Sequence, residues 1–189
     1  MSQVIIAGDT SGTITLQAPA VSGSTTYTLP AATGTVMVSG NMPAFSAYKN
    51  ALQNLTTNTS TLVSFQTEEF DTASAYNNTG STVGTAPQYS FNPQVAGYYQ
   101  INAAVNANTT WTRGSISVWK NGSAWKYCSD IIATTVNTVE ANALVYLNGS
   151  TDYVQIYLLV TGVSPQIYGD TPSSAAPYTY FQACLVRGA

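Results

Sequence analysis

The side chains that could carry acid–base chemistry are few and poorly placed for it. Glu68, Glu69 and Asp71 form the one cluster of carboxylates, while Asp130 and Glu140 stand alone. Adjacent residues of a strand point to opposite faces of a sheet, so Glu68 and Glu69 cannot serve one site. A glycoside hydrolase needs two carboxyl groups that face each other across a cleft. We therefore interpret the cluster as a solvated strand end whose charge discourages edge pairing.

Nucleophilic and metal chemistry lack their usual partners. The chain contains no histidine, the residue that most often serves as a general base or metal ligand. Cys128 and Cys184 are too few to hold zinc without imidazole ligands. Burial as small apolar side chains is favoured over a disulfide, and Cys184 lies in an apparent core strand. Calcium at Asp152 or Asp170 stays open, but we predict a protein without a cofactor that is not an enzyme.

Aromatic residues in polar surroundings are the candidates for binding. Trp111 lies in the segment 108–113 (NTTWTR), which we interpret as a polar turn and a candidate sugar- or receptor-binding loop, because an exposed tryptophan can stack on a sugar ring. The alternative is that Trp111 packs at a subunit interface. The long loop 161–177 is a second candidate, because loops on a rigid scaffold often carry binding residues. The candidate binding residues are Trp111, Arg113, Tyr168 and Asp170.

Composition indicates an all-β protein that associates with other protein chains. The 189 residues are 44% hydrophobic and 7% charged, with 13 tyrosines and a net charge of −3. β-branched and aromatic residues fit strands, and a surface with so little charge packs readily against copies of itself. The five basic residues are scattered, which argues against nucleic acid as a partner. We expect neither a membrane span nor a signal peptide, and therefore folding in a cytoplasm.

Residues 1–42 differ from the rest and are predicted to form an extended N-terminal arm for attachment or strand exchange. The pattern Thr-X-Thr-Leu before a proline marks short strands at 13–16 and 26–29, and a third is expected at 36–38. Strands this short need a neighbouring chain or surface to pair with. The predicted contact residues of the arm are Ile14, Leu16, Tyr27, Leu29 and Val36.

Residues 43–189 have the pattern of an antiparallel β-sandwich. Apolar and polar side chains alternate from Tyr98 to Ala107, and again on both sides of residues 148–149. Asn-Gly at 121–122 predicts a two-residue hairpin, and Asn-Gly at 148–149 predicts a turn. Further strands are expected at 60–70 and 178–186, and extended structure is favoured over a short helix at 44–55. This spacing indicates a sandwich or jelly roll.

Six landmarks in this part resemble the C1q-like and tumour-necrosis-factor superfamily of trimeric jelly rolls. They are PAFSA at 43–47, Val63 with Phe65, the NP and AGYY pair within 92–99, Val118 through the turn at 121–122, LNGSTDYV at 147–154, and YFQACL at 180–185. The match spans about 43–187 and lacks the collagen-like tract of complement-type members. It implies a homotrimer.

The arm resembles segments at the front of bacteriophage structural proteins, through TITL and TYTLPAATGTV. Together the resemblances imply a virion protein assembled in the host bacterial cytoplasm, whose partners are its own copies and the major capsid protein or another virion protein. One hypothesis is a trimeric capsid decoration (cement) protein that stabilises the head. The alternative is a receptor-binding tail or head fibre tip that recognises a host surface glycan or protein. The short chain without coiled-coil heptads favours the first, and a glycan-degrading enzyme is the weakest of three hypotheses.

Overall fold

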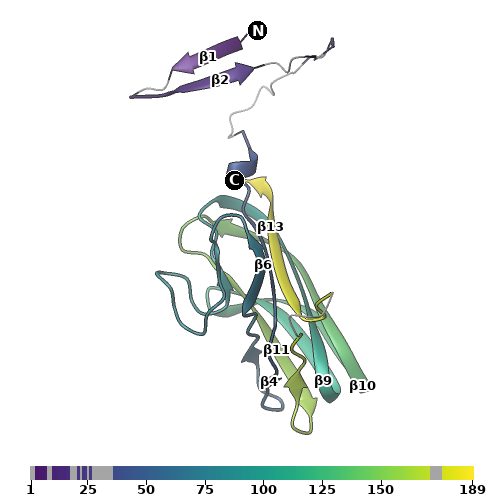
Figure 1. The fold of residues 1–189 in the computed structure, drawn as a ribbon. Helices are drawn as coiled ribbons and strands as arrows, with labels where there is room; N and C mark the ends of the chain where they lie inside the picture. The colour runs from purple at the N-terminus through teal and green to yellow at the C-terminus, as the bar shows by residue number, and fades with distance from the viewer. Residues whose placement is uncertain are drawn as a thin grey trace. The chain divides into compact units, whose positions relative to one another are not determined.

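The computed structural model describes residues 3–7, 10–17, 21, 23, 24, 26, 36–170 and 176–189. The chain divides into two compact units, Met1–Gly34 and Thr35–Ala189, which we describe separately (Figure 1). Within the described residues every regular element is a strand, apart from one 3-10 turn at Ser39–Asn41. The prediction of an all-β chain is confirmed.

The first unit contains an antiparallel pair, β1 (Gln3–Ala7) and β2 (Thr13–Gln17). Strand β2 was predicted, whereas its partner β1 was not. Ile6 lies opposite Ile14, so both side chains project from one face of the ribbon together with Leu16. All three are more than half exposed, and this face is therefore apolar and uncovered. Of the strand predicted at 26–29, residues 27–29, which include Tyr27 and Leu29, lie outside the described residues.

The strand predicted at 36–38 is wrong. Residues 36–38 have no regular structure and lead into the 3-10 turn. Asn41 causes this turn, because its side-chain Oδ1 accepts the Val38 N–H at 2.7 Å while its own N–H donates to Val38 O at 2.9 Å. A side chain that bonds back to the main chain in this way competes with strand pairing.

The second unit is a β-sandwich built around one long hairpin, β9 (Ala96–Lys120) and β10 (Ser123–Asn148). The other strands are β3 (Ala44–Tyr48), β4 (Gln53–Asn54), β5 (Thr61–Leu62), β6 (Thr67–Asp71), β7 (Tyr76–Asn77), β8 (Ser90–Phe91), β11 (Val154–Gly162), β12 (Gln166–Ile167) and β13 (Tyr180–Gly188). Residues 44–55 are extended, as favoured from the sequence. The predicted strand at 60–70 is present as two shorter pieces, β5 and β6.

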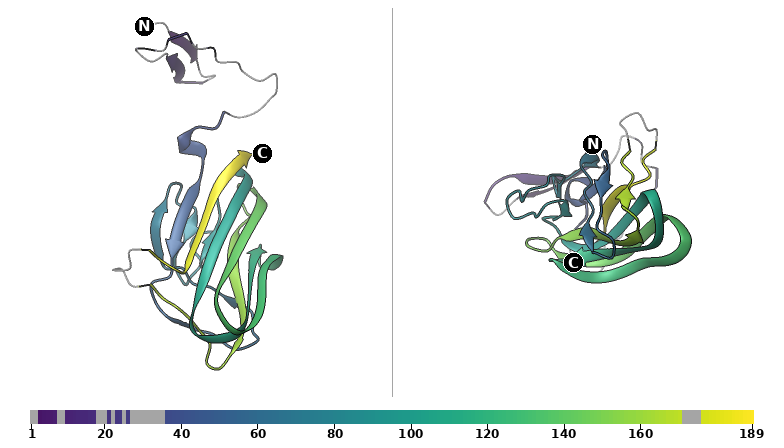
Figure 2. Two further views of the ribbon diagram at one scale, coloured as in Figure 1. Left: turned by 90° about the vertical axis from the view of Figure 1, so that its right-hand side faces the viewer. Right: turned by 90° about the horizontal axis from the view of Figure 1, so that it is seen from below.

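The long hairpin contributes to both layers of the sandwich. The first half of β9 pairs with β13 and with the end of β10, while its second half pairs with β11 and with the start of β10. The first sheet therefore runs β6-β3-β13-β9-β10, and in the left view of Figure 2 the yellow β13 lies between β3 and β9. The second sheet consists of the start of β10, the end of β9 and β11, with β5 and β8 beside β11.

The two sheets enclose one hydrophobic core. On the predicted inward face of β9, Tyr99, Ile101 and Val105 are fully buried, whereas Ala107 is partly buried. The second sheet contributes Ile116, Val118, Ile156 and Leu158, all fully buried. An aromatic cluster closes one part of the core: the Phe45 ring stacks on Tyr76 and Phe91 at 4.5 and 4.7 Å and meets Phe181 edge-on at 4.8 Å. Close-packed rings in these geometries add stability beyond the burial of their area.

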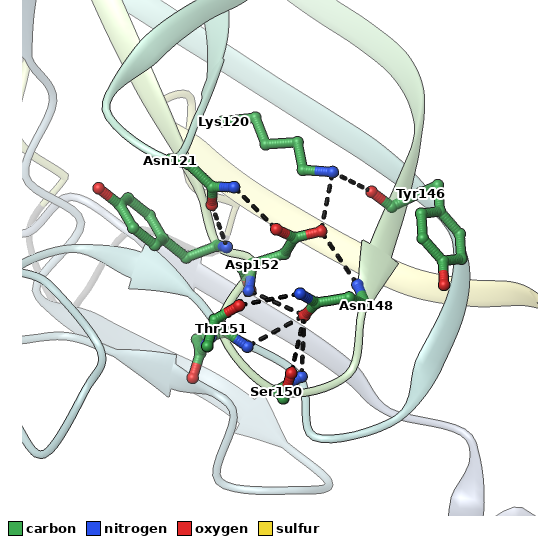
Figure 3. Close-up of polar contacts among 9 residues, drawn as sticks. Lys120, Asn121, Tyr146, Asn148, Ser150, Thr151 and Asp152 are labelled. Carbon is green, nitrogen blue, oxygen red and sulfur yellow. Dashed lines mark hydrogen bonds and ion pairs between the residues drawn. The ribbon is translucent and has the colours of Figure 1, made fainter.

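Both predicted Asn-Gly turns are confirmed. Asn121 and Gly122 have φ values of +52° and +77°, the left-handed pair that a two-residue hairpin with native twist requires. At the second turn, the Asn148 side-chain oxygen accepts N–H bonds from Ser150, Thr151 and Asp152, each at 3.0 Å (Figure 3). The turn between β10 and β11 is therefore held by one asparagine side chain.

Candidate interaction surfaces

The strands β9, β10 and β13 give the first sheet an outer face with few charged residues. Its outward side chains come from β9, β10 and β13, in rows set by the register: Tyr98 lies opposite Tyr146, and Gln100 lies between Leu144 and Cys184. Among the outward-facing residues of these three strand segments, only Glu140 and Arg187 are charged. We call the exposed apolar end of this surface the tyrosine face; it comprises Tyr98, Leu144, Tyr146, Cys184 and Val186.

The tyrosine face has the chemistry of a protein interface. Leu144 and Val186 are 50% and 59% exposed, and the rings of Tyr98 and Tyr146 lie 5.4 Å apart. Interface cores are enriched in tyrosine and depleted in lysine and glutamate. Contiguous apolar exposure of this kind marks interaction sites on soluble proteins.

Trp111 does not lie in an exposed turn, and that prediction is wrong. Residues 108–113 belong to β9, and the Trp111 ring is fully buried in the core. Thr110 and Thr112 project to the surface on the other side of the strand, which explains the polar surroundings. Trp111 therefore cannot stack on a sugar from outside.

Arg113 lies on the surface of the same strand and pairs with Asp130 of β10. The guanidinium donates two bonds to the carboxylate, from Nε at 2.9 Å and from Nη2 at 2.8 Å. The hydrogen bond with Asp130 raises the pKa of Arg113, and the same bond lowers the pKa of Asp130. The pair presents adjacent positive and negative groups on an exposed surface.

A groove opens beside this pair on the outer face of the second sheet. We call it the serine groove, because Ser115 and Ser117 form its floor between the side chains of Arg113 and Trp119. The hollow has a volume of about 440 Å³. Its lining residues are Ser60, Arg113, Ser115, Ser117, Trp119, Tyr127, Asp130 and Leu159. Of the predicted binding residues, only Arg113 lines the groove, and Trp119 forms one of its walls.

The pattern of residues 115–118 in the sequence could have predicted the floor of this groove. Ser115 and Ser117 alternate with the buried Ile116 and Val118, so the outward side of this strand segment is small and polar between two large side chains. The position of Tyr127 opposite Ser117 could not be predicted in this way, because it depends on the register of β9 and β10.

Tyr168 and Asp170, the candidates in the loop 161–177, do not face the serine groove. The Tyr168 ring is partly buried and lies edge-on to the Tyr178 ring at 6.3 Å. Asp170 is fully buried, and its Oδ2 accepts the N–H groups of Tyr178 and Thr179, both at 3.1 Å. Its carboxylate thus ties two parts of the chain together and is not an exposed ligand, contrary to our prediction. Tyr168 stays a candidate for binding.

Asp152, the other residue considered for calcium, is occupied by a network of protein groups (Figure 3). Its two oxygens accept bonds from Asn121 Nδ2 at 2.7 Å and the Asn148 N–H at 3.1 Å, and Lys120 Nζ lies 2.8 Å away. Burial by itself would raise the pKa of Asp152, but these hydrogen bonds and the Lys120 charge outweigh it and lower that pKa. The carboxylate joins the turn at 121–122 to the turn at 148–152, and the described residues contain no group of three or more metal-ligating side chains.

The cysteines are free thiols. Cys128 is partly buried against the core, as expected, whereas Cys184 is exposed on the tyrosine face. The prediction that Cys184 belongs to the core is therefore wrong, although its strand is correct. Phe181, Ala183 and Leu185 are the buried residues of β13, so the alternation of the strand places Cys184 outside.

The arm contacts that the structure describes are uncovered. Ile14, Leu16 and Val36 are 64%, 58% and 68% exposed. No helix in the described residues is long and apolar enough to span a membrane.

Comparison with known proteins identifies the fold. The structure of murine APRIL at pH 8.0 matches with a TM-score of 0.52 at 11% sequence identity, covering 77% of this chain and 99% of that chain. Murine APRIL at pH 5.0 matches with a TM-score of 0.51 at 12% identity, over 77% and 99% of the two chains. PRD1 vertex protein P5 matches with a TM-score of 0.46 at 15% identity, over 78% of this chain and 98% of that chain. No protein-family model and no curated protein sequence matches the chain.

The second unit therefore has a jelly-roll fold similar to that of murine APRIL, and a jelly roll is the fold that the sequence resemblance implied. At these identities the comparisons establish the fold, and the function must be argued from the surfaces of this chain.

Proposed function

We propose that this chain is a bacteriophage virion structural protein: a homotrimeric capsid decoration protein that stabilises the head. The observation that carries the proposal is the tyrosine face, an exposed apolar surface on a rigid sheet, with Lys120 and Arg187 as the charged residues beside its tyrosines. Such a face is stable in water when a copy of the same chain covers it. The sequence resemblance of the jelly roll supports three copies.

In this proposal the arm attaches the trimer to the shell. The apolar side of the β1–β2 ribbon, with Ile6, Ile14 and Leu16, is uncovered, and a two-stranded ribbon alone is at best marginally stable in water. Pairing with a strand of the major capsid protein, or of another virion protein, would complete the sheet and bury these residues. The resemblance of the arm to phage structural proteins supports a virion as its location.

The alternative is a receptor-binding tip on a tail or head fibre that recognises a host surface glycan or protein. The serine groove favours it, because the groove is an exposed concave surface with aromatic walls. Few copies per particle would be needed for that role, which separates the two functions.

The first experiment is to measure the copy number of this chain per purified virion, by quantitative mass spectrometry against the major shell protein. We expect a number comparable to that of the shell protein. A handful of copies would overturn decoration and support a fibre tip, and absence from the particle would overturn both.

The tyrosine face itself is tested by Leu144→Lys. A lysine within a covered apolar surface would bury an unpaired charge, at a cost of several kcal/mol per interface. We expect the wild-type chain to sediment as a trimer in analytical ultracentrifugation and the variant as a monomer of unchanged fold.

The matched control is Ile132→Lys, which places the same charge on another exposed position of β10, 78% accessible and outside the tyrosine face. The control should remain trimeric. A monomeric wild type, or a Leu144→Lys variant that stays trimeric, would show that the tyrosine face does not join copies of this chain.

A further inference from the structure

The serine groove differs from ordinary strand surface in its unused hydrogen-bonding groups. The hydroxyls of Ser60, Ser115 and Tyr127 have no hydrogen-bond partner among the described residues, although all three line one hollow. The Ser117 hydroxyl accepts the Trp119 indole N–H at 3.0 Å, so this bond fixes the orientation of the indole ring. The groove thus presents ready hydrogen-bonding groups on a rigid sheet.

Aromatic rings form the walls of the same groove. Trp119 stacks on Tyr157, with ring centroids 3.9 Å apart and planes within 17° of each other, so the indole is held as a fixed platform. Tyr127 stands across from it on β10 with 73% of its surface exposed. A monomeric protein leaves such a large ring in water at a cost, and exposed aromatics with one polar end are typical of binding surfaces.

The charged residues that line the groove have no net charge. Arg113 and Asp130 are the two charged residues that line it, and they are joined by two hydrogen bonds. Arg113 Nη1 has no partner among the described residues, so it can still donate to a ligand. A ligand with a net charge would find no uncompensated partner here, whereas one with neutral donors and acceptors would find several.

From this combination we propose that the serine groove binds a neutral oligosaccharide. The apolar C–H face of a hexose fits an aromatic platform, and its vicinal hydroxyls fit fixed hydroxyls and a guanidinium–carboxylate pair, since each hydroxyl both donates and accepts. A wholly apolar ligand would cover the hydroxyls of Ser60 and Ser115 without giving them hydrogen-bond partners, which is unfavourable. A nucleic acid would need an excess of basic groups that the groove lacks.

The groove stays accessible if the chain trimerises as proposed. It lies on the outer face of the second sheet, and the tyrosine face lies on the outer face of the first, so the two surfaces are on opposite sides of the sandwich. The inference depends neither on a virion location nor on decoration, and it would add a saccharide site to either role.

The test uses the full-length chain on a printed array of neutral hexose and N-acetylhexosamine oligosaccharides, with uronate-containing ones included. We expect binding to neutral members, and then a change in tryptophan fluorescence when the best soluble oligosaccharide is titrated. Trp119→Phe should abolish the fluorescence change and Tyr127→Ala should weaken binding at least tenfold. Tyr127 is mostly exposed, so its loss should leave the fold intact by circular dichroism.

Trp125→Phe is the matched control, because Trp125 is 52% exposed on β10 but does not line the groove. It should keep both the affinity and the fluorescence change. Binding to acidic oligosaccharides alone, binding that survives both groove variants, or no binding on the array would each overturn the proposal. The copy number per virion is a separate measurement, so the failure of one proposal is distinguishable from the failure of the other.

Discussion

Gly149→Ala is expected to destabilise the jelly roll by about 3 kcal/mol, because the new methyl group would meet main chain and not a movable side chain. Gly149 has a φ of +72°, and a Cβ built there lies 2.7 Å from Val95 C and in still closer contact with Ala96 N. Those atoms cannot move away easily, since Ala96 begins β9 and pairs with Asn148. The turn held by the Asn148 side chain would have to open.

Gly122→Ala is the control for this prediction. Gly122 has a similar φ of +77°, but a Cβ there finds only the Tyr153 hydroxyl, at 3.4 Å. Its substitution should cost about 1 kcal/mol, the ordinary penalty of a left-handed residue other than glycine. Urea unfolding of the two variants separates the conformational penalty from the backbone contact, and equal losses would show that the turn adjusts to the methyl group.

The sequence predicted this turn because its requirements are local. An Asn-Gly pair between two alternating strands specifies a positive φ and an asparagine that bonds to the next backbone amides, with no distant partner needed. The covered face of β9 was predictable for a similar reason, since one alternation of side chains decides which face is buried. The close contact of Gly149 with β9 was not predictable, because it depends on how the second turn sits against the start of that strand.

Trp111 shows how a local pattern was misinterpreted. The odd-numbered face that buries Tyr99, Ile101 and Val105 also buries Trp111, with the half-buried residues 107 and 109 between them, but the threonines on either side of Trp111 led us to predict a turn. Just beyond Trp111 the pairing with β11 shifts by one residue: Gly162 lies opposite Trp111 and Thr161 lies opposite Arg113. A bulge of this kind exchanges the two faces, so the buried set changes from odd to even numbers, as Ile116 and Val118 show.

The remaining surfaces depend on contacts between distant segments. Asp170 is buried because the backbone of Tyr178 and Thr179 folds back over it, and no neighbouring residue indicates that. The serine groove likewise needs the register that sets Tyr127 opposite Ser117 and places Leu159 of β11 in the same hollow. Sequence patterns therefore predicted the alternating strand segments and both Asn-Gly turns, whereas the candidate sites required the pairing of the strands.

The second large effect is expected from Lys49: the free energy of unfolding should increase with pH in wild-type protein but not in Lys49→Met. The Lys49 side chain is fully buried, and its Nζ donates to Ser64 Oγ at 2.7 Å and Ser64 O at 3.1 Å. Among the described residues no carboxylate lies within ion-pair distance of Nζ. Burial lowers the pKa of Lys49 from 10.5 to about 8. The charged form in the folded state is therefore disfavoured by roughly 3 kcal/mol.

The sign of the pH dependence follows from which state binds more protons. Between pH 8 and 10.5 the unfolded chain keeps the Lys49 proton while the folded chain has lost it, so the free energy of unfolding rises with pH in that range. Below pH 8 both states are protonated and this contribution is constant. From pH 7.5 to 9.5 we expect an increase of about 2 kcal/mol in wild-type protein relative to Lys49→Met.

Urea unfolding at pH 7.5, 8.5 and 9.5 measures this difference, with Lys126→Met, at an exposed position of β10, as the control. The free energy of unfolding of the control should change with pH as that of the wild type does, because replacing an exposed lysine removes no buried charge. Burial also raises the pKa of Tyr76, and that of Tyr99 to about 12, which lowers stability as the pH passes the ordinary tyrosine value near 10. Those tyrosines are present in all three proteins, so their effect cancels in the comparison. Parallel curves for wild type and Lys49→Met would mean that the buried ammonium is compensated by its bonds to Ser64.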